Sequence, residues 1–181
     1  MKNSFMRGAT VFAVVMGLSS SAFTETLPVP DGLVATDIPG AKELPDPALT
    51  YKVVFDIGKA APKIGDVNPM LEAVARFMNT LAKNGVSADH RKVAVVFHQQ
   101  GTEIILNDET FKARNKGHGN PNVALIQSLK KAGVDFRVCG QAVLANKIDQ
   151  KTILPEIQVD LWALTTLVNL ELRGYVHVGG N

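Results

Sequence analysis

The sequence predicts an α/β fold, a three-layer sandwich in which helices cover both faces of a mainly parallel sheet. Strand-like apolar runs alternate with helix-like segments along the chain, and this alternation implies right-handed βαβ crossovers. The run Lys92–His98 is almost continuously apolar and rich in β-branched valine, as expected for a buried parallel strand. The chain has 181 residues, 46% hydrophobic and 20% charged, which suits one ordinary globular domain.

The first half of this domain shows the alternation clearly. Tyr51–Ile57 is apolar enough to be a central strand, and a helix is expected to open at Pro69 and to stop at Gly85. This helix carries apolar side chains at helical spacing, which predicts one buried face. The next expected elements are a second strand, a short third strand and a polar helix, over Lys92–His98, Glu103–Leu106 and Glu109–Asn115.

The second half is organised around residues 120–148. Asn120 is expected to cap a helix that has Pro121 at its first position and Gly133 as its stop. Three strands are expected after this helix, over Val134–Val138, Ile157–Val159 and Tyr175–Val178. Two further helices are expected between them, over Gln141–Asn146 and Leu161–Arg173. Asp160 is the expected cap of the long helix, whose apolar side chains share one face: Leu161, Leu164, Val168 and Leu172.

The segment GNPNVALIQSLKKAGVDFRVCGQAV, residues 119–143, resembles the signature of the DsrE/DsrF-like family, which has the YchN-like fold. The resemblance continues to the end of the chain. It implies a three-layer α/β sandwich that assembles as a homo-oligomer, a trimer or a hexamer. Members that act in sulfur oxidation and tRNA thiolation carry sulfur on a cysteine, although on a loop different from the one that holds Cys139 here.

Residues 1–22 have the pattern of a cleavable signal peptide. Lys2 and Arg7 give a basic start, Ala9–Leu18 an apolar core, and Ser20–Ala22 a small-residue cleavage site. The apolar core is too short to span a bilayer as a helix, so an uncleaved anchor is the lesser alternative. We expect cleavage after Ala22, export, and a bacterial periplasmic location.

The mature chain then divides into a Pro-rich arm, residues 23–50, and a DsrE-like domain, residues 51–181. The arm has five prolines and little periodicity, which predicts an extended segment. Residues 1–22 contain two of the 19 basic residues and none of the 17 acidic ones, so 17 of each remain. This balance leaves no basic patch for nucleic acid or an anionic membrane.

Cys139 is the only cysteine, so no internal disulfide can form. It is expected where a strand ends and a helix begins, at the edge where open α/β sheets bind ligands. Helix N–H groups there favour the thiolate. The functional hypothesis is a nucleophile that accepts and passes on sulfur as a persulfide. The alternatives are a buried structural side chain and a thiol that pairs with another chain.

His98 is expected to end its strand at the same edge, where its ring would accept the thiol proton or pair with the thiolate. Cys139 and His98 are therefore the candidate catalytic residues. The alternative for His98 is a ring hydrogen-bonded to a loop carbonyl. The resemblance also implies a histidine here, followed by glycine, whereas this chain has Gln99. Asp56 ends the first strand at this edge and is expected to be a solvated carboxylate.

A metal site and a cofactor site both lack a motif in this chain. His118 would complete a soft metal site with His98 and Cys139, but no two of them have the spacing of a zinc motif. The chain also lacks the GxGxxG motif of dinucleotide sites and the GxxxxGK[ST] motif of phosphate-binding loops. It has neither the CxxC motif of dithiol enzymes nor the GxSxG motif of serine hydrolases. We therefore predict no metal and no cofactor.

Other side chains near the cysteine have weaker expected roles. Arg137 and Gln141 flank Cys139 and would orient an anionic group. Trp162 is expected to pack in the core or in a subunit interface.

Two functions from different classes follow from these residues. The first is a periplasmic sulfur-handling protein that carries a persulfide on Cys139 and meets a sulfur-donor or acceptor protein. The second is a non-catalytic, oligomeric ligand-binding or interaction module in which Cys139 is structural. Neither involves nucleic acid, nor a membrane once the signal peptide is removed.

Overall fold

A computed structural model describes residues 26–179, and it contains the predicted parallel sheet. The strands are β1 (Tyr51–Ile57), β2 (Arg91–Phe97), β3 (Asp135–Cys139), β4 (Ile157–Asp160) and β5 (Val176–Gly179). Their order is β4-β3-β2-β1-β5, and every neighbouring pair is parallel. The strand predicted over residues 51–57 is therefore confirmed at both ends.

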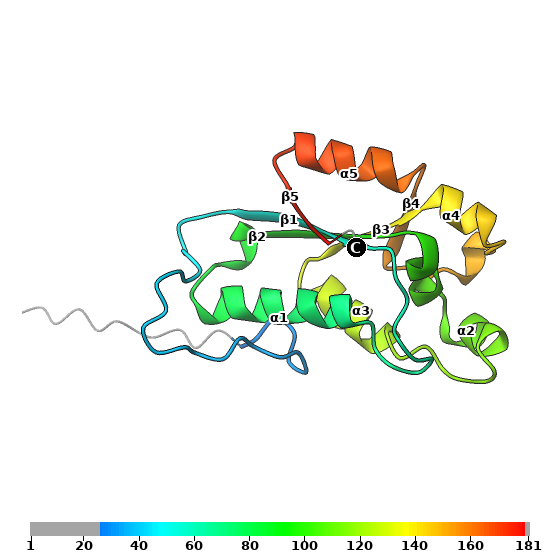
Figure 1. The fold of residues 1–181 in the computed structure, drawn as a ribbon, viewed down its shortest axis with the longest axis horizontal. Helices are drawn as coiled ribbons and strands as arrows, with labels where there is room; N and C mark the ends of the chain where they lie inside the picture. The colour runs from blue at the N-terminus through cyan, green and yellow to red at the C-terminus, as the bar shows by residue number, and fades with distance from the viewer. Residues whose placement is uncertain (1–25, 180–181) are drawn as a thin grey trace, which may run out of the picture.

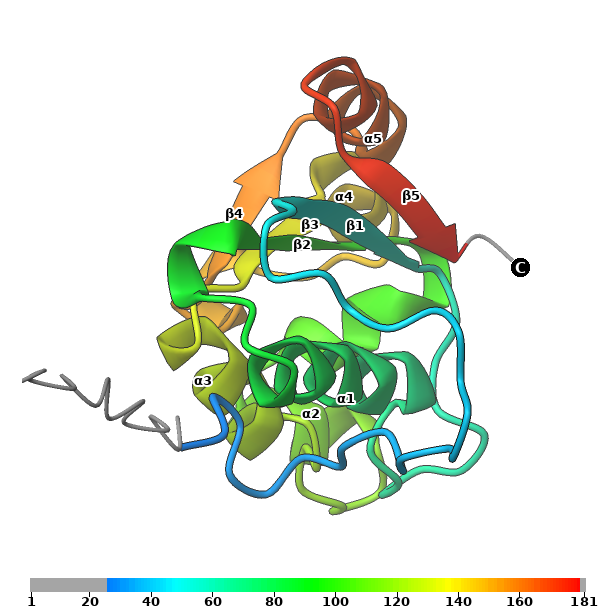
Figure 2. The ribbon, with the colours of Figure 1, turned by 90° about the vertical axis from the view of Figure 1, so that its left-hand side faces the viewer.

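The helices cover both faces of this sheet, which confirms the predicted α/β sandwich (Figure 1). They are α1 (Pro69–Lys83), α2 (Asp108–Arg114), α3 (Val123–Lys131), α4 (Gly140–Ala145) and α5 (Ala163–Leu172). Three short 3₁₀ helices are η1 (Ala88–His90), η2 (Gln99–Ile105) and η3 (Gln150–Thr152). Figures 1 and 2 show α1 and α3 on one side of the sheet and α5 on the other.

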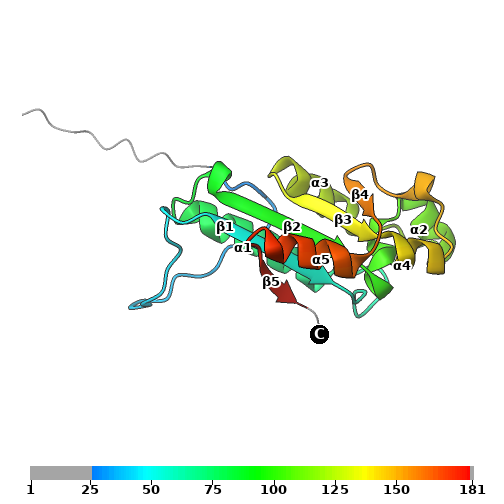
Figure 3. The same cartoon turned by 90° about the horizontal axis from the view of Figure 1, so that it is seen from above.

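The topology explains why α5 lies alone on its side. From β1 to β4 each strand is added next to the one before, in a single direction across the sheet. The step from β4 to β5 returns across the whole sheet, so a right-handed crossover must pass over the opposite face. Seen from above, α5 lies over β1 and β2 and runs roughly along the strands (Figure 3).

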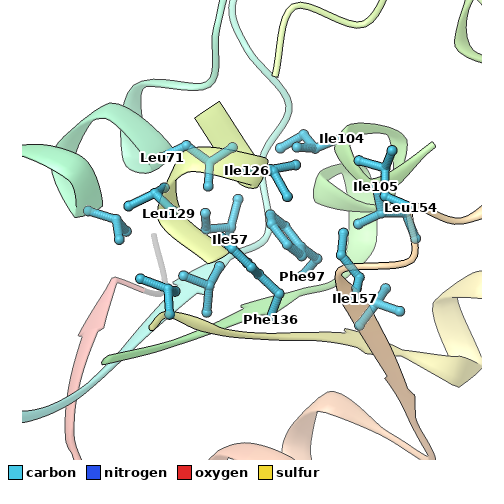
Figure 4. Packing of buried hydrophobic residues seen from close by; sticks show 14 of the residues in the cluster. Ile57, Leu71, Phe97, Ile104, Ile105, Ile126, Leu129, Phe136, Leu154 and Ile157 are labelled. Atoms are coloured by element: carbon cyan, nitrogen blue, oxygen red, sulfur yellow. The ribbon is translucent and has the colours of Figure 1, made fainter. Parts of the chain in front are cut away.

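The main hydrophobic core fills the face under α1 and α3. Alternate side chains of the central strands point into it, including Phe97 and Phe136, whose rings stack with centroids 5.9 Å apart. Helix side chains such as Leu71, Ile126 and Leu129 close this core, as Figure 4 shows. Burial of these large apolar side chains is the main source of the free energy of folding.

Helix α1 begins and ends where the sequence predicts. The side chain of Asn68 caps it by accepting a hydrogen bond from the N–H of Met70 at 2.9 Å, and Pro69 is its first residue. Gly85, with φ +82°, ends it in the left-handed conformation that glycine adopts readily.

The strand predicted over Glu103–Leu106 is wrong. This segment lies in η2, and Leu106 makes only an isolated antiparallel bridge to Ile153. Within η2, Gly101 packs directly against β1, where a Cβ would lie 2.1 Å from the carbonyl oxygen of Ile57. This 3₁₀ helix still directs the apolar side chains of the segment into the main core.

The predicted role of Asn120 as a helix cap is also wrong. Helix α3 begins at Val123 after Asn122, which makes no side-chain capping bond. The side-chain oxygen of Asn120 accepts a hydrogen bond from the backbone N–H of Asn122 at 3.0 Å, one residue before the helix begins. Its buried amide donates to the carbonyl oxygens of Ile104 at 2.9 Å and Leu106 at 2.7 Å. It therefore ties the start of α3 to η2.

Helix α5 is shorter than predicted, because it begins at Ala163 and Asp160 does not cap it. The Asp160 carboxylate accepts hydrogen bonds from the Thr166 hydroxyl at 2.9 Å and from Arg137 at 3.2 Å. The predicted apolar face of α5 exists, but it points away from the sheet: Leu161, Leu164, Val168 and Leu172 are all exposed. The buried face is formed by Ala163, Thr166, Leu167 and Leu170.

The Pro-rich arm has no helix or strand in residues 26–50, yet part of it packs against α1. Val29 is fully buried, and its backbone N–H and carbonyl both bond to the side chain of Asn79, at 3.0 and 2.8 Å. Lys83 pairs with Asp37 further along the arm. The predicted signal peptide, residues 1–22, lies outside the described residues. Within residues 26–179, no helix has the length and apolar character needed to cross a bilayer.

Candidate functional site

Strand periodicity gathers the chemically active side chains on the α5 face of the sheet. Side chains alternate between the two faces of a strand, and the odd-numbered residues of β1 and β2 fill the main core. Asp56 and His98 therefore point to the opposite face, together with Cys139 at the end of β3. In the parallel register, Cys139 lies beside Asp160 and Asp56 beside Gly179. All these side chains meet at the carboxyl edge of the sheet, where α/β folds bind ligands.

His98 is bound by a carboxylate, not by the loop carbonyl considered from the sequence. Its backbone N–H donates to the carbonyl oxygen of Ile57 at 3.1 Å, and its ring Nε2 hydrogen-bonds Oδ1 of Asp56. The ring lies close over Gly58, where a Cβ would be 2.8 Å from Cε1 of the imidazole. Glycine at this position thus permits the contact between His98 and Asp56.

Gln99, directly after His98, has a φ of +47°, in the left-handed region that side chains rarely adopt. Glycine adopts this conformation freely, and the family resemblance implies glycine at this position. The chain therefore holds a strained residue beside the candidate base. Backbone strain of this kind is often found at functional sites.

Asp56 is buried, with 7% of its side chain exposed, so the prediction of a solvated carboxylate is wrong. Its second oxygen, Oδ2, lies 3.4 Å from Nε2 of His177, and Nδ1 of His177 lies 3.0 Å from Glu171. Burial alone would raise the pKa of Asp56. The hydrogen bond and charge of His98, and the charge of His177, outweigh burial and lower this pKa below its ordinary value.

The result is a chain of polar side chains from the sheet edge to the surface. The exposed fraction of the side chain rises along it, from 7% at Asp56 to 31% at His177 and 47% at Glu171. Sequence reasoning missed His177 and Glu171. The strand that contains His177 was predicted, but its pairing with β1 was not, and only this pairing brings His177 to Asp56.

Cys139 lies at the predicted strand-to-helix turn and is the last residue of β3. It is 4% exposed and packs in a small cluster with side chains such as Ala94, Val96 and Leu167. Gly140 allows the tight turn, because a Cβ there would lie 2.6 Å from the carbonyl oxygen of Asp160. The thiol is thus fixed between β4 and the start of α4.

A cavity of about 490 Å³ opens beside this thiol. The cavity lies beside the ends of β3 and β4, whose connections leave toward opposite faces of the sheet. The connection after β3 stays on the face of the main core, whereas the connection after β4 crosses to the other face and forms α5. Its lining residues are His98, Gln99, Cys139, Gln141, Ala142, Ala145, Asn146, Trp162, Ala163, Leu164 and Leu167. The structure therefore brings both predicted catalytic residues, Cys139 and His98, to one cavity.

His118 is not part of this site. Its ring lies near Gly65, with Nδ1 3.8 Å from where a Cβ would be, and it does not line the cavity of Cys139 and His98. Across residues 26–179, no three His, Cys, Asp or Glu side chains are grouped so that they could hold a metal ion. The metal site considered from the sequence is therefore not formed by these three residues.

The other flanking side chains are accounted for as well. Arg137 bonds to Asp135 at 2.9 Å and to Asp160 at 3.2 Å, so it does not line the cavity. Burial lowers the pKa of Arg137, but its bonds and charge interactions with Asp135 and Asp160 outweigh this and raise it. Gln141 lines the cavity and donates to the carbonyl oxygen of Leu161 at 3.3 Å. Trp162 is 46% exposed on the cavity wall, so it does not pack in the core, and the other expected place, a subunit interface, stays a prediction.

Comparisons with known proteins agree with this fold. A solved structure of a protein of unknown function, MTH1491 from Methanobacterium thermoautotrophicum, aligns with a TM-score of 0.54 at 19% sequence identity. The alignment covers 71% of this chain and 97% of that chain, and at this identity it shows the fold alone. No curated protein matches. Residues 52–178, from β1 to β5, match the DsrE/DsrF-like family, and the chain therefore belongs to that family.

Proposed function

We propose that the protein handles sulfur by carrying it as a persulfide on Cys139. One observation carries the proposal: Cys139 and His98 line the same cavity, and His98 is held by the buried carboxylate of Asp56. A nucleophile, a base and a group that orients the base are the three parts of an activated thiol site. The family is associated with sulfur relay, which agrees with this chemistry.

In the proposed loading step, His98 accepts the proton of the Cys139 thiol. The thiolate attacks the outer sulfur of a donor persulfide, R–S–S–H, where R is the carrier group of the donor. The donor S–S bond breaks as a new S–S bond forms on Cys139, and the donor leaves as a thiolate, R–S⁻. This thiolate takes up the proton held by His98, so neither an oxidant nor a reductant is consumed. Transfer to an acceptor thiol follows the same step in reverse.

The proposal includes a location and an assembly. The signal-like residues 1–22 support export to the periplasm, where the carrier would meet a sulfur-donor or acceptor protein. The exposed apolar face of α5, with Leu161, Leu164 and Leu172, supports a homo-oligomer. Trp162 and Leu164 belong to both this face and the cavity wall, so a second subunit on this face would lie next to the cavity.

The test uses mature protein that begins at Phe23, incubated with inorganic polysulfide and weighed by intact-mass spectrometry. We expect the mass of one sulfur atom to be added to the wild type, removed by a reducing agent, and absent from Cys139→Ser. Alkylation of the native thiol near neutral pH should be slower in His98→Ala, since the base is lost. Circular dichroism of each variant checks that it is folded.

One observation favours a second function, a non-catalytic ligand-binding module with a structural cysteine. Cys139 is 4% exposed and packs among apolar side chains, as inert cysteines do. This alternative predicts a thiol that reacts with alkylating reagents only in denaturant. A native wild-type protein that neither alkylates nor gains sulfur would exclude the persulfide carrier.

A further inference from the structure

The cavity beside Cys139 has no formally charged side chain in its lining. Lys, Arg, Asp and Glu are all absent from the described residues that form its wall. Arg137 on the same face of the sheet is paired with Asp135 and Asp160, and Asp56 is paired with the two histidines. The one basic group at the cavity, His98, is already bound to a carboxylate.

This wall disfavours a small sulfur oxyanion. A sulfur oxyanion that entered the cavity would give up part of its hydration shell and would meet no positive side chain that is not already paired. Loss of hydration without a counter-charge is one of the larger penalties in protein recognition. Protein sites that select oxyanions usually supply arginine, a helix N-terminus or several backbone N–H groups. Two helices begin at the cavity, the six-residue α4 and the ten-residue α5, but neither brings an arginine or lysine to its wall.

The same wall suits an apolar group. Trp162, Leu164 and Leu167 face the cavity from α5 and its first turn, and Ala142 and Ala145 face it from α4. A volume of about 490 Å³ is within the range of small-molecule sites. The amide side chains of Gln141 and Asn146 supply neutral hydrogen-bonding groups at its edge.

We infer that the cavity binds the carrier group of the sulfur donor, and that this group is an uncharged, largely apolar organic group. A small sulfur oxyanion such as thiosulfate is then not the donor. The inference rests on the proposed function, because it names the chemical class of R in R–S–S–H. The apolar wall holds R, and the reacting sulfur lies beside Cys139 and His98.

The chain provides its own reporter for a binding test. Trp162 is the only tryptophan, it lines the cavity, and it is 46% exposed, so a bound apolar group should change its fluorescence. The probe is a neutral alkyl thioether, hexyl methyl sulfide, which cannot transfer sulfur. Titration of Cys139→Ser protein with this probe separates binding from chemistry. Failure of sulfur loading would therefore leave this result unaffected.

We expect a saturable change of Trp162 emission with the thioether and no change with thiosulfate. Leu164→Lys places a cation on the wall at a half-exposed position, so it should fold normally. It should weaken thioether binding on the order of tenfold, which corresponds to the loss of one leucine contact. Leu49→Lys is the matched control: Leu49 is 55% exposed, close to the 52% of Leu164, and it lies in the Pro-rich arm and does not line the cavity, so binding should be unchanged.

Three results would overturn the inference. Saturable binding of thiosulfate in preference to the thioether would assign the cavity to an oxyanion. No response to the thioether at any concentration would mean that the wall accepts no apolar small molecule. An emission change that follows protein concentration, together with a larger mass in light scattering, would assign the cavity wall to contact with a second copy of the chain.

Discussion

The two faces of the sheet differ in size and in chemistry. Among the described residues, the face under α1 and α3 has a cluster of 25 buried apolar residues. The α5 face has a cluster of seven, and one of these is Cys139. The second face also contains Asp56, His98 and His177, whose polar atoms are bound to one another. The face under α1 and α3 therefore supplies most of the free energy of folding. This allows the α5 face to hold buried polar groups that contribute less to that free energy.

The largest expected effect is the loss in free energy of unfolding when a buried leucine is replaced by alanine, and we expect it to differ between the two faces. Leu129→Ala removes a fully buried side chain from the main core, and Leu170→Ala removes a side chain that is 3% exposed from the smaller cluster. Leu→Ala substitutions in cores lower the free energy of unfolding by about 2–5 kcal/mol. We expect Leu129→Ala near the upper end, because neighbours surround it, and Leu170→Ala near the lower end, because α5 can move inward. Urea unfolding measures both. An equal or larger loss in Leu170→Ala would contradict the comparison.

Asp56→Asn tests whether the polar side chains of the α5 face serve chemistry. The substitution keeps the shape but removes the charge that binds His98, so alkylation of native Cys139 should slow on the order of tenfold. The free energy of unfolding at pH 7 should fall by about 1.5–3 kcal/mol, the contribution of a hydrogen bond to a charged group. Asp89→Asn is the control, since Asp89 is exposed and distant in sequence from the site. Unchanged alkylation in Asp56→Asn would remove Asp56 as the positioning residue.

The same variant has an expected pH dependence. Because the pKa of Asp56 is lowered in the folded protein, its ionised form stabilises the fold above the pKa of the unfolded carboxyl, about 3.9. This stabilisation is lost as the pH falls through the lower pKa of the folded state. The difference in unfolding free energy between wild type and Asp56→Asn should therefore shrink below about pH 4. A constant difference from pH 7 to pH 3 would contradict this account.

The smallest expected effect concerns Gln99, at the edge where the two faces meet. Relief of its left-handed φ gains about 1–2 kcal/mol, and the greater freedom of glycine in the unfolded chain costs about 0.5–1 kcal/mol. Gln99→Gly should therefore raise the free energy of unfolding by up to about 1.5 kcal/mol. Gln100→Gly, at a neighbouring residue without a positive φ, should lower it by about 0.5–1 kcal/mol. If Gln99→Gly and Gln100→Gly both lowered the free energy of unfolding, the backbone at Gln99 would not be strained.

The sequence was sufficient for features that depend on local pattern. Tyr51–Ile57 could be predicted at both ends, because a strand buried on both faces is apolar throughout. Helix α1 could be predicted because Pro69 and Gly85 are placed where their backbone preferences require. Cys139 and His98 could be assigned to one edge, because both follow parallel strands.

Features that depend on tertiary contacts could not be predicted. Glu103–Leu106 has an apolar pattern that fits a strand or a turn, and the close approach of Gly101 to Ile57, which accompanies the turn, does not follow from that pattern. The apolar stripe of α5 was visible, but the pattern alone does not show that it faces away from the sheet. The contact between Asp56 and His177 could not be predicted from the sequence, since only the pairing of β1 with β5 brings these two side chains together.

That pairing also determines the order in which the protein can be assembled. Val53 in the first strand pairs with Val176 in the last one, so this contact spans most of the chain and is among the slowest kinds to form. β1 and β2 can associate as soon as β2 has been synthesised, whereas β5 is synthesised after every other element. Until β5 docks, Asp56 lacks His177 and the sheet has an open edge at β1. A newly made chain would therefore have most of its stability before its candidate site is complete.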